Sequence, residues 1–298
     1  MSKINLKIEK AFLELLRCGM WGTKPSLLAF SELSSADWSE IYSIAGRQTV
    51  LGICLKVVLE LPSNLQPPSN LLLQWIGVNR FIEANNRQML QVWHEFSSKL
   101  NAAGFETVVF KGMTVAKWYA HPLSRQSSDI DVFIPERFDE AIQLIKSWGF
   151  ECEHKTQHDS IVYKGVTIEI HPRLMTTPFP PRIDCKVCRD TVANGMSVSI
   201  PDPDTNCLLL LSHAGGHFLF PGIGFRFLCD WAVFLKSNYQ NINREIVQAE
   251  AKRMGLLPFL TEFTKLAECK LGLDFPDLEL WTKGSIEKYC YRDRKSVV

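Results

Sequence analysis

The chain lacks an excess of charge of either sign. Its 298 residues contain 33 lysines and arginines against 32 aspartates and glutamates, so the formal net charge is +1. Domains that bind nucleic acid usually carry a basic patch or stripe that meets the phosphates. The balanced composition therefore makes RNA or DNA an unlikely partner.

The sequence also lacks a run of about 18 or more apolar residues, the length that a membrane-spanning helix needs. Its first five residues, Met1 to Asn5, do not resemble the apolar core of a signal peptide. Nine cysteines are scattered along the chain, an odd number that fits a reducing compartment. These absences predict a cytoplasmic protein with no membrane partner.

A second cysteine pair is missing as well. Cys185 and Cys188 form a Cys-x-x-Cys, which can open a zinc site or act as a redox pair. No second Cys-x-x-Cys and no His-x-x-x-His lies close by in the sequence. Cys152, His154 and His158 would join the pair only through tertiary contacts, so we interpret it as a coincidence.

Hydrophobic periodicity divides the chain into three parts. Residues 3–100 are predicted to be mostly helical, with a first amphipathic helix around residues 8–16, one or two helices over 37–58 and a long helix over 70–100. Residues 105–172 contain short apolar strands and a helix over 136–148, and residues from 203 onward are again helical. The pattern predicts an α+β fold with a small mixed sheet (104–200), an N-terminal helical cap (1–103) and a C-terminal helical bundle (201–298).

Two aspartates on one strand are the most informative motif. Residues 128–134 suit a strand, and successive side chains of a strand point to opposite faces. Asp129 and Asp131 then share a face, about 7 Å apart along the strand. Two such carboxylates repel each other unless a divalent cation lies between them, and a pair of cations can bind the attacking and leaving oxygens of a phosphoryl displacement.

A third carboxylate supports the metal interpretation. Residues 161–171 read as two strands that turn at Lys164-Gly165, and Glu169 in the second strand is surrounded by β-branched residues. If this strand lies beside the first, Glu169 completes a three-carboxylate site with Asp129 and Asp131. An Asp-x-Asp on a sheet edge can also be merely solvated, and glycosyltransferases use the same motif to hold a nucleotide diphosphate.

A Lys-Gly turn precedes the two aspartates. Residues 108–110 form a short apolar strand that ends at Lys111 and Gly112, and residues 113–119 suit a helix. A glycine at such a turn lets the backbone approach a phosphate, and Lys111 adds a positive charge. Arg125 follows in a polar loop; it could pair with Asp129 or Asp131 when no metal is bound.

The sequence at this point resembles the polymerase-β-type nucleotidyltransferase superfamily, and more closely its poorly characterised group labelled "nucleotidyltransferase family protein". The resemblance covers about residues 75–235. The residues that carry it are Lys111, Gly112, Tyr119, Arg125, Asp129, Asp131 and Glu169. The Gly-Ser that usually precedes the Asp-x-Asp is absent, because Met113 follows Gly112.

The resemblance implies a role for each of these positions. Asp129 and Asp131 would bind the metal that carries the nucleotide phosphates, and Glu169 would hold the catalytic metal and orient or deprotonate an acceptor hydroxyl. Amides around Gly112 would cradle the phosphates, while Lys111 and Arg125 would neutralise charge on them. Two ions, Mg²⁺ or Mn²⁺, and an NTP as co-substrate are implied.

A second group of polar residues lies in the C-terminal part. His213 and His217 are one turn apart on a helix predicted over 206–219, and Arg226 and Asp230 are one turn apart on the next helix. One interpretation is purely structural: the four residues form polar contacts between the two helices, with Arg226 and Asp230 paired at i, i+4. The family resemblance implies instead that these four residues, with Tyr119, line the substrate pocket.

The combined prediction is a metal-dependent nucleotidyltransferase that moves an NMP from an NTP to a hydroxyl-type acceptor and releases pyrophosphate. The acceptor could be a small molecule or a protein side chain. Two alternatives stay open. The chain could be a non-catalytic module of the same fold, or an Asp-x-Asp glycosyltransferase, which the helical N-terminal region disfavours.

Overall fold

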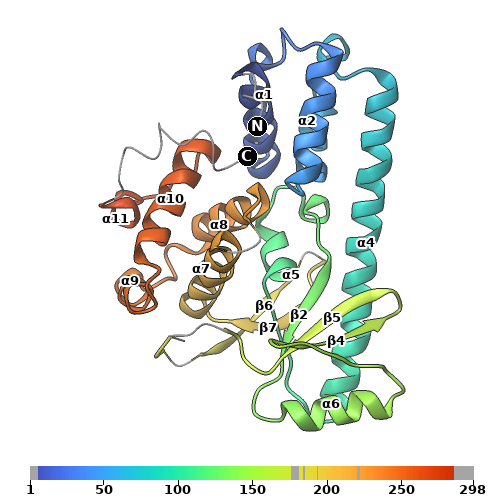
Figure 1. Cartoon of the computed structure of the whole chain (residues 1–298), viewed down its shortest axis with the longest axis vertical. Helices are drawn as coiled ribbons and strands as arrows, with labels where there is room; N and C mark the ends of the chain where they lie inside the picture. The colour runs from blue at the N-terminus through green and yellow to red at the C-terminus, as the bar shows by residue number, and fades with distance from the viewer. Residues whose placement is uncertain (1–5, 176–180, 184, 193, 220–221, 285–298) are drawn as a thin grey trace.

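A mixed sheet flanked by helices from both ends of the chain forms the framework of the protein (Figure 1). The computed structural model describes residues 6–175, 181–183, 185–192, 194–219 and 222–284. Within these residues the sheet has seven strands in the order β3-β4-β5-β2-β1-β7-β6. The strands are β1 Val108–Phe110, β2 Asp129–Phe133, β3 Glu153–His154, β4 Asp159–Tyr163, β5 Val166–His171, β6 Val187–Thr191 and β7 Ser197–Pro201. The predicted α+β class is confirmed.

Two parallel pairings hold the centre of the sheet together. Strand β2 runs parallel to β5, and β1 runs parallel to β7, while the β1–β2 pair is antiparallel. The predicted hairpin is present, because β4 and β5 turn at Lys164-Gly165. Both turn residues have positive φ (50° and 78°), as a two-residue hairpin turn of type I′ requires.

The N-terminal region is helical, as predicted. Its α-helices are α1 Leu6–Trp21, α2 Ser35–Arg47, α3 Leu51–Val58 and α4 Ser69–Ala102. The start of α2 has a capping box, in which the Ser34 hydroxyl accepts from the Asp37 amide and the Asp37 carboxylate accepts from the Ser34 amide. The 34 residues of α4 make a rod about 50 Å long that runs past the cap and the sheet (Figure 1).

The C-terminal region is helical as well. Its helices are α7 Pro203–Leu219, α8 Phe225–Asn238, α9 Arg244–Arg253, α10 Leu257–Leu271 and α11 Glu279–Thr282. No helix among the described residues is long and apolar enough to cross a membrane. Residues 285–298, which belong to the predicted C-terminal region, lie outside the described part.

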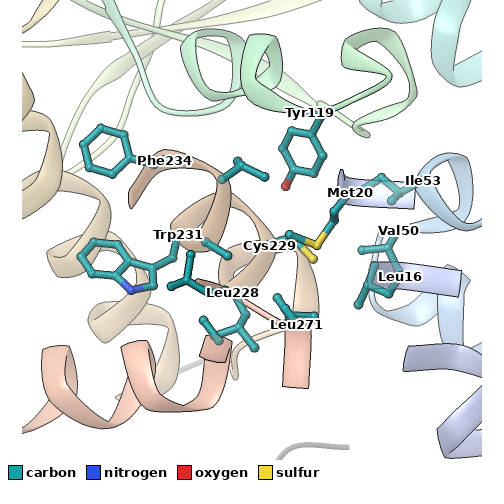
Figure 2. Close-up of a cluster of buried hydrophobic side chains, with 14 of the residues drawn as sticks. Leu16, Met20, Val50, Ile53, Tyr119, Leu228, Cys229, Trp231, Phe234 and Leu271 are labelled. Atoms are coloured by element: carbon teal, nitrogen blue, oxygen red, sulfur yellow. The ribbon is translucent and has the colours of Figure 1, made fainter. Parts of the chain in front are cut away.

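The first and last helices share one apolar core. Leu16 of α1, Ile53 of α3, Trp231 of α8 and Leu271 of α10 are buried in the same cluster (Figure 2). The N-terminal cap and the C-terminal bundle therefore pack on each other and not only on the sheet. Tyr119, from the loop between β1 and β2, reaches into the edge of this cluster.

A second core fills the space between the sheet, α4 and the helix α6 Phe138–Ser147. Trp75 near the start of α4 belongs to the first core, whereas Trp93 and Phe96 farther along belong to the second. Helix α4 thus ties the two cores together. The apolar faces of β2 and β5 are buried in the second core, so their other faces are left for polar side chains.

Two segments differ from the sequence-based prediction. The helix predicted over 113–119 is a single α-turn, α5 Gly112–Val115, followed by 3₁₀ turns at Ala116–Trp118 and Pro122–Ser124. Two segments for which the sequence patterns predict no element, Val187–Thr191 and Ser197–Pro201, form the antiparallel pair β6–β7. Further 3₁₀ turns lie at Leu27–Ala29 and Ser63–Leu65.

Candidate active site

The register of β2 and β5 brings the predicted carboxylates together. Asp131 lies opposite Glu169, and Asp129 lies opposite Thr167, on adjacent parallel strands. The intervening residues Ile130 and Ile168 are fully buried on the other face of the sheet. The prediction that Asp129, Asp131 and Glu169 share one face is thus confirmed, and its cause is the two-residue alternation of both strands.

Lys111 neutralises the central carboxylate. It stands at the end of β1, next to Phe110, which pairs with Asp131 in the sheet. Its Nζ donates to Asp131 Oδ1 at 2.5 Å. Burial alone would raise the pKa of Asp131, but Lys111 and His171 lower it to about 2. Asp131 is therefore a buried carboxylate that stays ionised because two basic groups face it.

Glu169 has the opposite character. Burial and the nearby charges of Asp131 and Asp129 raise the pKa of Glu169 to about 7. Its oxygens face two imidazoles: His158 Nε2 lies 3.2 Å from Oε1, and His171 Nε2 lies 3.7 Å from Oε2. Repulsion among neighbouring carboxylates, which raises the pKa of one of them, is typical of sites that bind cations.

Arg125 makes a buried ion pair across the interface between the sheet and the C-terminal helices. Its Nη2 and Nε donate to the Asp230 carboxylate at 2.6 Å and 3.1 Å. Tyr119 donates its hydroxyl to the same carboxylate at 2.6 Å, and Arg125 Nη1 donates to Ser127 at 2.9 Å. The predicted pairing of Arg125 with Asp129 or Asp131 is wrong, because Asp230 on α8 takes the guanidinium.

Gly112 and Arg125 are in close contact. A Cβ atom built on Gly112 would lie 2.7 Å from Arg125 Nη1, closer than real Cβ contacts allow. Arg125 is only 4% exposed and most of its donors are engaged within the protein. The arrangement therefore favours a role for Arg125 beneath the Lys-Gly turn over direct contact with phosphates.

The helices α7 and α8 bring four predicted residues to the same region. The rings of His213 and His217 are tilted against Phe227, with centroids 5.3 Å and 4.5 Å from it, and the Arg226 guanidinium lies 5.4 Å from that ring. Arg226 donates to the Gln126 carbonyl at 3.1 Å. The predicted pairing of Arg226 with Asp230 is wrong, because Asp230 bonds to Arg125 and Tyr119 instead.

His213 is close enough to the carboxylates to be affected by their partners. Burial lowers the pKa of His213 to about 3, and the charge of Lys111 contributes in the same direction while Asp131 opposes it. Burial also lowers the pKa of His217, with contributions from Arg226 and Lys111. The two histidines are thus neutral bases beside the Lys111–Asp131 pair.

Two residues of the site were not predicted to take part in it. His171 lies two residues after Glu169 on the same face of β5, and it bonds to Asp131 Oδ1 at 3.0 Å. His158 was considered only as a neighbour of the cysteines, yet its ring lies 5.0 Å from that of His171. The Glu-x-His spacing on β5 was a usable signal for His171, whereas His158 reaches the site only through the β4–β5 pairing.

The chain can be aligned with solved structures over little more than half of its length. No curated protein matches the sequence. Among solved structures, the antibiotic-resistance factor ANT(2'')-Ia aligns with 13% identity and a TM-score of 0.45 over 56% of this chain and 91% of that one. An antigenic nucleotidyltransferase-like protein from Paracoccidioides brasiliensis aligns with 17% identity and a TM-score of 0.38 over 59% and 91%.

The family comparison covers most of the chain and includes every residue of the site. The profile of the family described as "uncharacterised nucleotidyltransferase" matches residues 34–272. The matched part begins at the cap of α2 and ends just after α10, so it spans the whole sheet and the second apolar core, and the first core without the residues of α1 and α11. The chain therefore belongs to this nucleotidyltransferase family.

Proposed function

We propose that this protein transfers a nucleoside monophosphate from an NTP to a hydroxyl-type acceptor, with divalent metal ions and release of pyrophosphate. The observation that carries the proposal is the register that sets Asp131 beside Glu169, with Asp129 two residues away on the same face. Membership of the family supports nucleotidyl transfer in general. The metal, the donor and the acceptor are parts of the proposal.

The acidic residues fit the metal that such chemistry uses. Carboxylate oxygens are the ligands that Mg²⁺ and Mn²⁺ prefer, and three carboxylates gather on one sheet face here. The raised pKa of Glu169, due to burial and to Asp131 and Asp129, marks an excess of negative charge that cations would relieve. Asp129, Asp131 and Glu169 would hold two ions, which supply charge neutralisation for the attacking and leaving oxygens.

Lys111 and the turn after it suit the phosphate end of the donor. The Lys111 amine lies 2.5 Å from Asp131, on the face of the sheet that carries the carboxylates, and the Lys111 side chain is 17% exposed. With cations bound at Asp131, the Lys111 amine would be free to neutralise phosphate oxygens. Gly112, next in the chain, keeps the backbone free of a side chain at the same place, and Arg125 supports the turn from below.

The histidine pair and Phe227 suit the organic part of a substrate. His213, His217 and Phe227 are half-buried rings in edge-to-face or tilted contact with one another, and Arg226 lies against Phe227. Aromatic faces with a cation beside them favour flat or anionic groups such as a nucleobase or a phosphate. Tyr119 and Asp230 are buried, and Asp230 accepts hydrogen bonds from both Arg125 and Tyr119. We therefore assign Tyr119 and Asp230 to positioning the residues around this ring cluster. The acceptor is a small molecule or a protein side chain, and the proposed location is the cytoplasm.

Calorimetry with nucleotides tests the proposal. ATP, GTP, CTP and UTP are titrated with Mg²⁺ or Mn²⁺ into wild type, Glu169→Ala and the double variant Asp129→Ala/Asp131→Ala. The expected result is metal-dependent binding of one NTP by wild type, lost in the double variant and altered in Glu169→Ala. Pyrophosphate release then confirms turnover, and transfer of label from an α-labelled NTP to candidate acceptors identifies the acceptor class.

A matched control separates the site from the general acidity of the sheet. Glu153→Ala removes an exposed carboxylate from β3, outside the site, and should bind nucleotide as wild type does. Circular dichroism confirms that each variant is folded. Binding of NTP by the double variant at wild-type strength would refute the three-carboxylate mechanism. Absence of binding for all four NTPs with either metal would favour the non-catalytic module.

A further inference from the structure

Two imidazoles and a carboxylate form a compact cluster beside the two aspartates. His158, Glu169 and His171 each offer one ligand atom, and these atoms lie within 4.8 Å of one another. Their side chains are 15%, 20% and 8% exposed. The cluster is therefore largely shielded from solvent, although its members are all polar.

The sheet itself builds this cluster. Strand β4 pairs with β5 so that Asp159 lies opposite Ile170, which puts His158 beside His171. Glu169 and His171 lie on the same face of β5, two residues apart. Glu169 and His171 thus come from a paired strand and His158 from the residue directly before β4, and a site on such rigid elements keeps its geometry better than a site on loops.

The nitrogen of His158 has an unusual environment. Its Nε2 is buried and has no hydrogen-bond partner among the described residues, although it lies 3.2 Å from a Glu169 oxygen. Buried polar atoms in native proteins nearly always have a partner. A ring nitrogen and a carboxylate oxygen this close without a hydrogen bond can both direct lone pairs at one shared cation.

His171 can serve the same cation without leaving Asp131 unpaired. Asp131 Oδ1 accepts from Lys111 at 2.5 Å and from His171 at 3.0 Å. Asp131 keeps its hydrogen bond from Lys111 when His171 Nε2 turns toward Glu169, 3.7 Å away. All three donors of the cluster can therefore meet at one point.

We infer that His158, Glu169 and His171 bind a divalent first-row transition-metal ion, of which Zn²⁺ is the simplest probe. Two imidazoles and one carboxylate favour such ions, whereas Mg²⁺ prefers oxygen ligands alone. Three protein ligands leave positions open for water or substrate. The further consequence rests on the proposed function: the ion held by Glu169 during nucleotidyl transfer is then a transition metal, and Mg²⁺ serves only the nucleotide at Asp129 and Asp131.

Metal binding without nucleotide tests the site directly. Chelator-treated protein is titrated with Co²⁺, followed by visible absorption, and the Co²⁺ is then displaced with Zn²⁺. A Cys185→Ser/Cys188→Ser background removes the exposed Cys-x-x-Cys as a competing thiolate site. The expected result is one Co²⁺ per chain with a nitrogen–oxygen spectrum, displaced by Zn²⁺ and not by Mg²⁺.

Variants of the new ligand decide the outcome. His158→Ala and the more conservative His158→Gln should weaken Zn²⁺ binding by roughly tenfold or more. His94→Ala, at an exposed position of α4, should not. Equal Zn²⁺ affinity in wild type and both His158 variants, or a signal lost with the cysteines, would overturn the inference.

The same measurements separate this inference from the proposed function. Zn²⁺ binding that depends on His158, with no NTP bound under any metal, would support the metal site and refute the transferase. Binding of NTP with Mg²⁺ by wild type, without specific binding of Co²⁺ or Zn²⁺, would support the transferase and refute the transition-metal site.

Discussion

Arg125 and Asp230, which are 105 residues apart in the sequence, form a buried ion pair with a shortest distance of 2.6 Å. Arg125 lies in the loop between β1 and β2, and Asp230 lies on α8, so the pair joins the sheet region to the C-terminal helices. Gly112 packs against the same guanidinium. The pair therefore fixes the Lys-Gly turn relative to the helices that bring His213 and Arg226 to the site.

Breaking this pair should destabilise the whole protein. Asp230→Ala leaves the Arg125 charge buried without its partner, a change that costs about 3–5 kcal/mol of unfolding free energy. Urea unfolding followed by circular dichroism measures the loss. Arg47→Gln is the matched control, because it removes a solvent-exposed ion pair with Glu40, and it should change the free energy by less than about 1 kcal/mol. If Asp230→Ala lowered the free energy of unfolding by less than about 1 kcal/mol, the structural role of the ion pair would be contradicted.

The close approach of Gly112 to Arg125 gives a second prediction. Gly112→Ala puts a methyl group 2.7 Å from a guanidinium that Asp230 holds in place, so the unfolding free energy should fall by about 1–3 kcal/mol. The measurement is again urea unfolding, with NTP calorimetry on the folded variant. If the methyl group displaces Arg125 or the turn, nucleotide binding should weaken as well.

A glycine without neighbours supplies the control for this substitution. Gly77 lies within α4, is exposed, and would have nothing within 4 Å of an added Cβ. Gly77→Ala should therefore raise stability by up to about 1 kcal/mol, because alanine is the better helix former. Opposite signs for the two Gly→Ala changes are the expected result. Equal signs would show that Gly112 is not confined by Arg125.

The parts of the site that follow from local sequence were predicted well. Because the side chains of a strand alternate between two faces, Asp129 and Asp131 share one face of β2. For the same reason, Glu169 and His171 share one face of β5. The β4–β5 hairpin follows from the Lys164-Gly165 turn. These predictions need only neighbouring residues, and the structure confirms them.

The parts that depend on distant pairing were missed or wrong. Asp230 was assigned to Arg226, one turn away on the same helix, because sequence spacing shows only neighbours on one element. Its real partner, Arg125, comes from a different region of the chain. His158 likewise enters the site through the β4–β5 register. Strand β7 pairs in parallel with β1, although these are the last and the first strands of the sheet in the sequence.

The half-buried His213 should make stability depend on pH. Burial lowers the pKa of His213 to about 3, with Lys111, His217 and Arg226 acting in the same direction and Asp131 opposing them. A native pKa below the unfolded value of about 6.5 means that the unfolded state binds the extra proton. The stability due to neutral His213 is therefore complete above about pH 6.5 and is lost progressively as the pH falls toward 3.

Substitution removes this proton-linked term. The free energy of unfolding of wild type relative to His213→Gln should fall by up to about 1.4 kcal/mol per pH unit below pH 6. Urea unfolding at several pH values between 7 and 4 gives the difference, and contributions from all other groups cancel in it. His121→Gln, at an exposed position, is the matched control. A constant difference between wild type and His213→Gln would show that His213 is not held neutral.

Lys111 should be under backbone strain because of its place at the site. Its φ of 58° and ψ of −128° lie in a region that glycine adopts readily and other residues rarely adopt. Lys111→Ala and Lys111→Gly both remove the amine that bonds Asp131, so their comparison isolates the backbone. Lys111→Gly should be the more stable of the two by about 1 kcal/mol, measured by thermal or urea unfolding.

The same pair of substitutions at Lys99 should give the opposite order. Lys99 is exposed near the end of α4, and there glycine is less favourable than alanine by about 1 kcal/mol. Both Lys111 variants should also lose NTP affinity equally, because the amine and not the backbone neutralises the phosphates in the proposed mechanism. If Lys111→Ala matched Lys111→Gly in stability, the turn would not be strained. If either variant bound NTP as tightly as wild type, Lys111 would have no part in holding the donor.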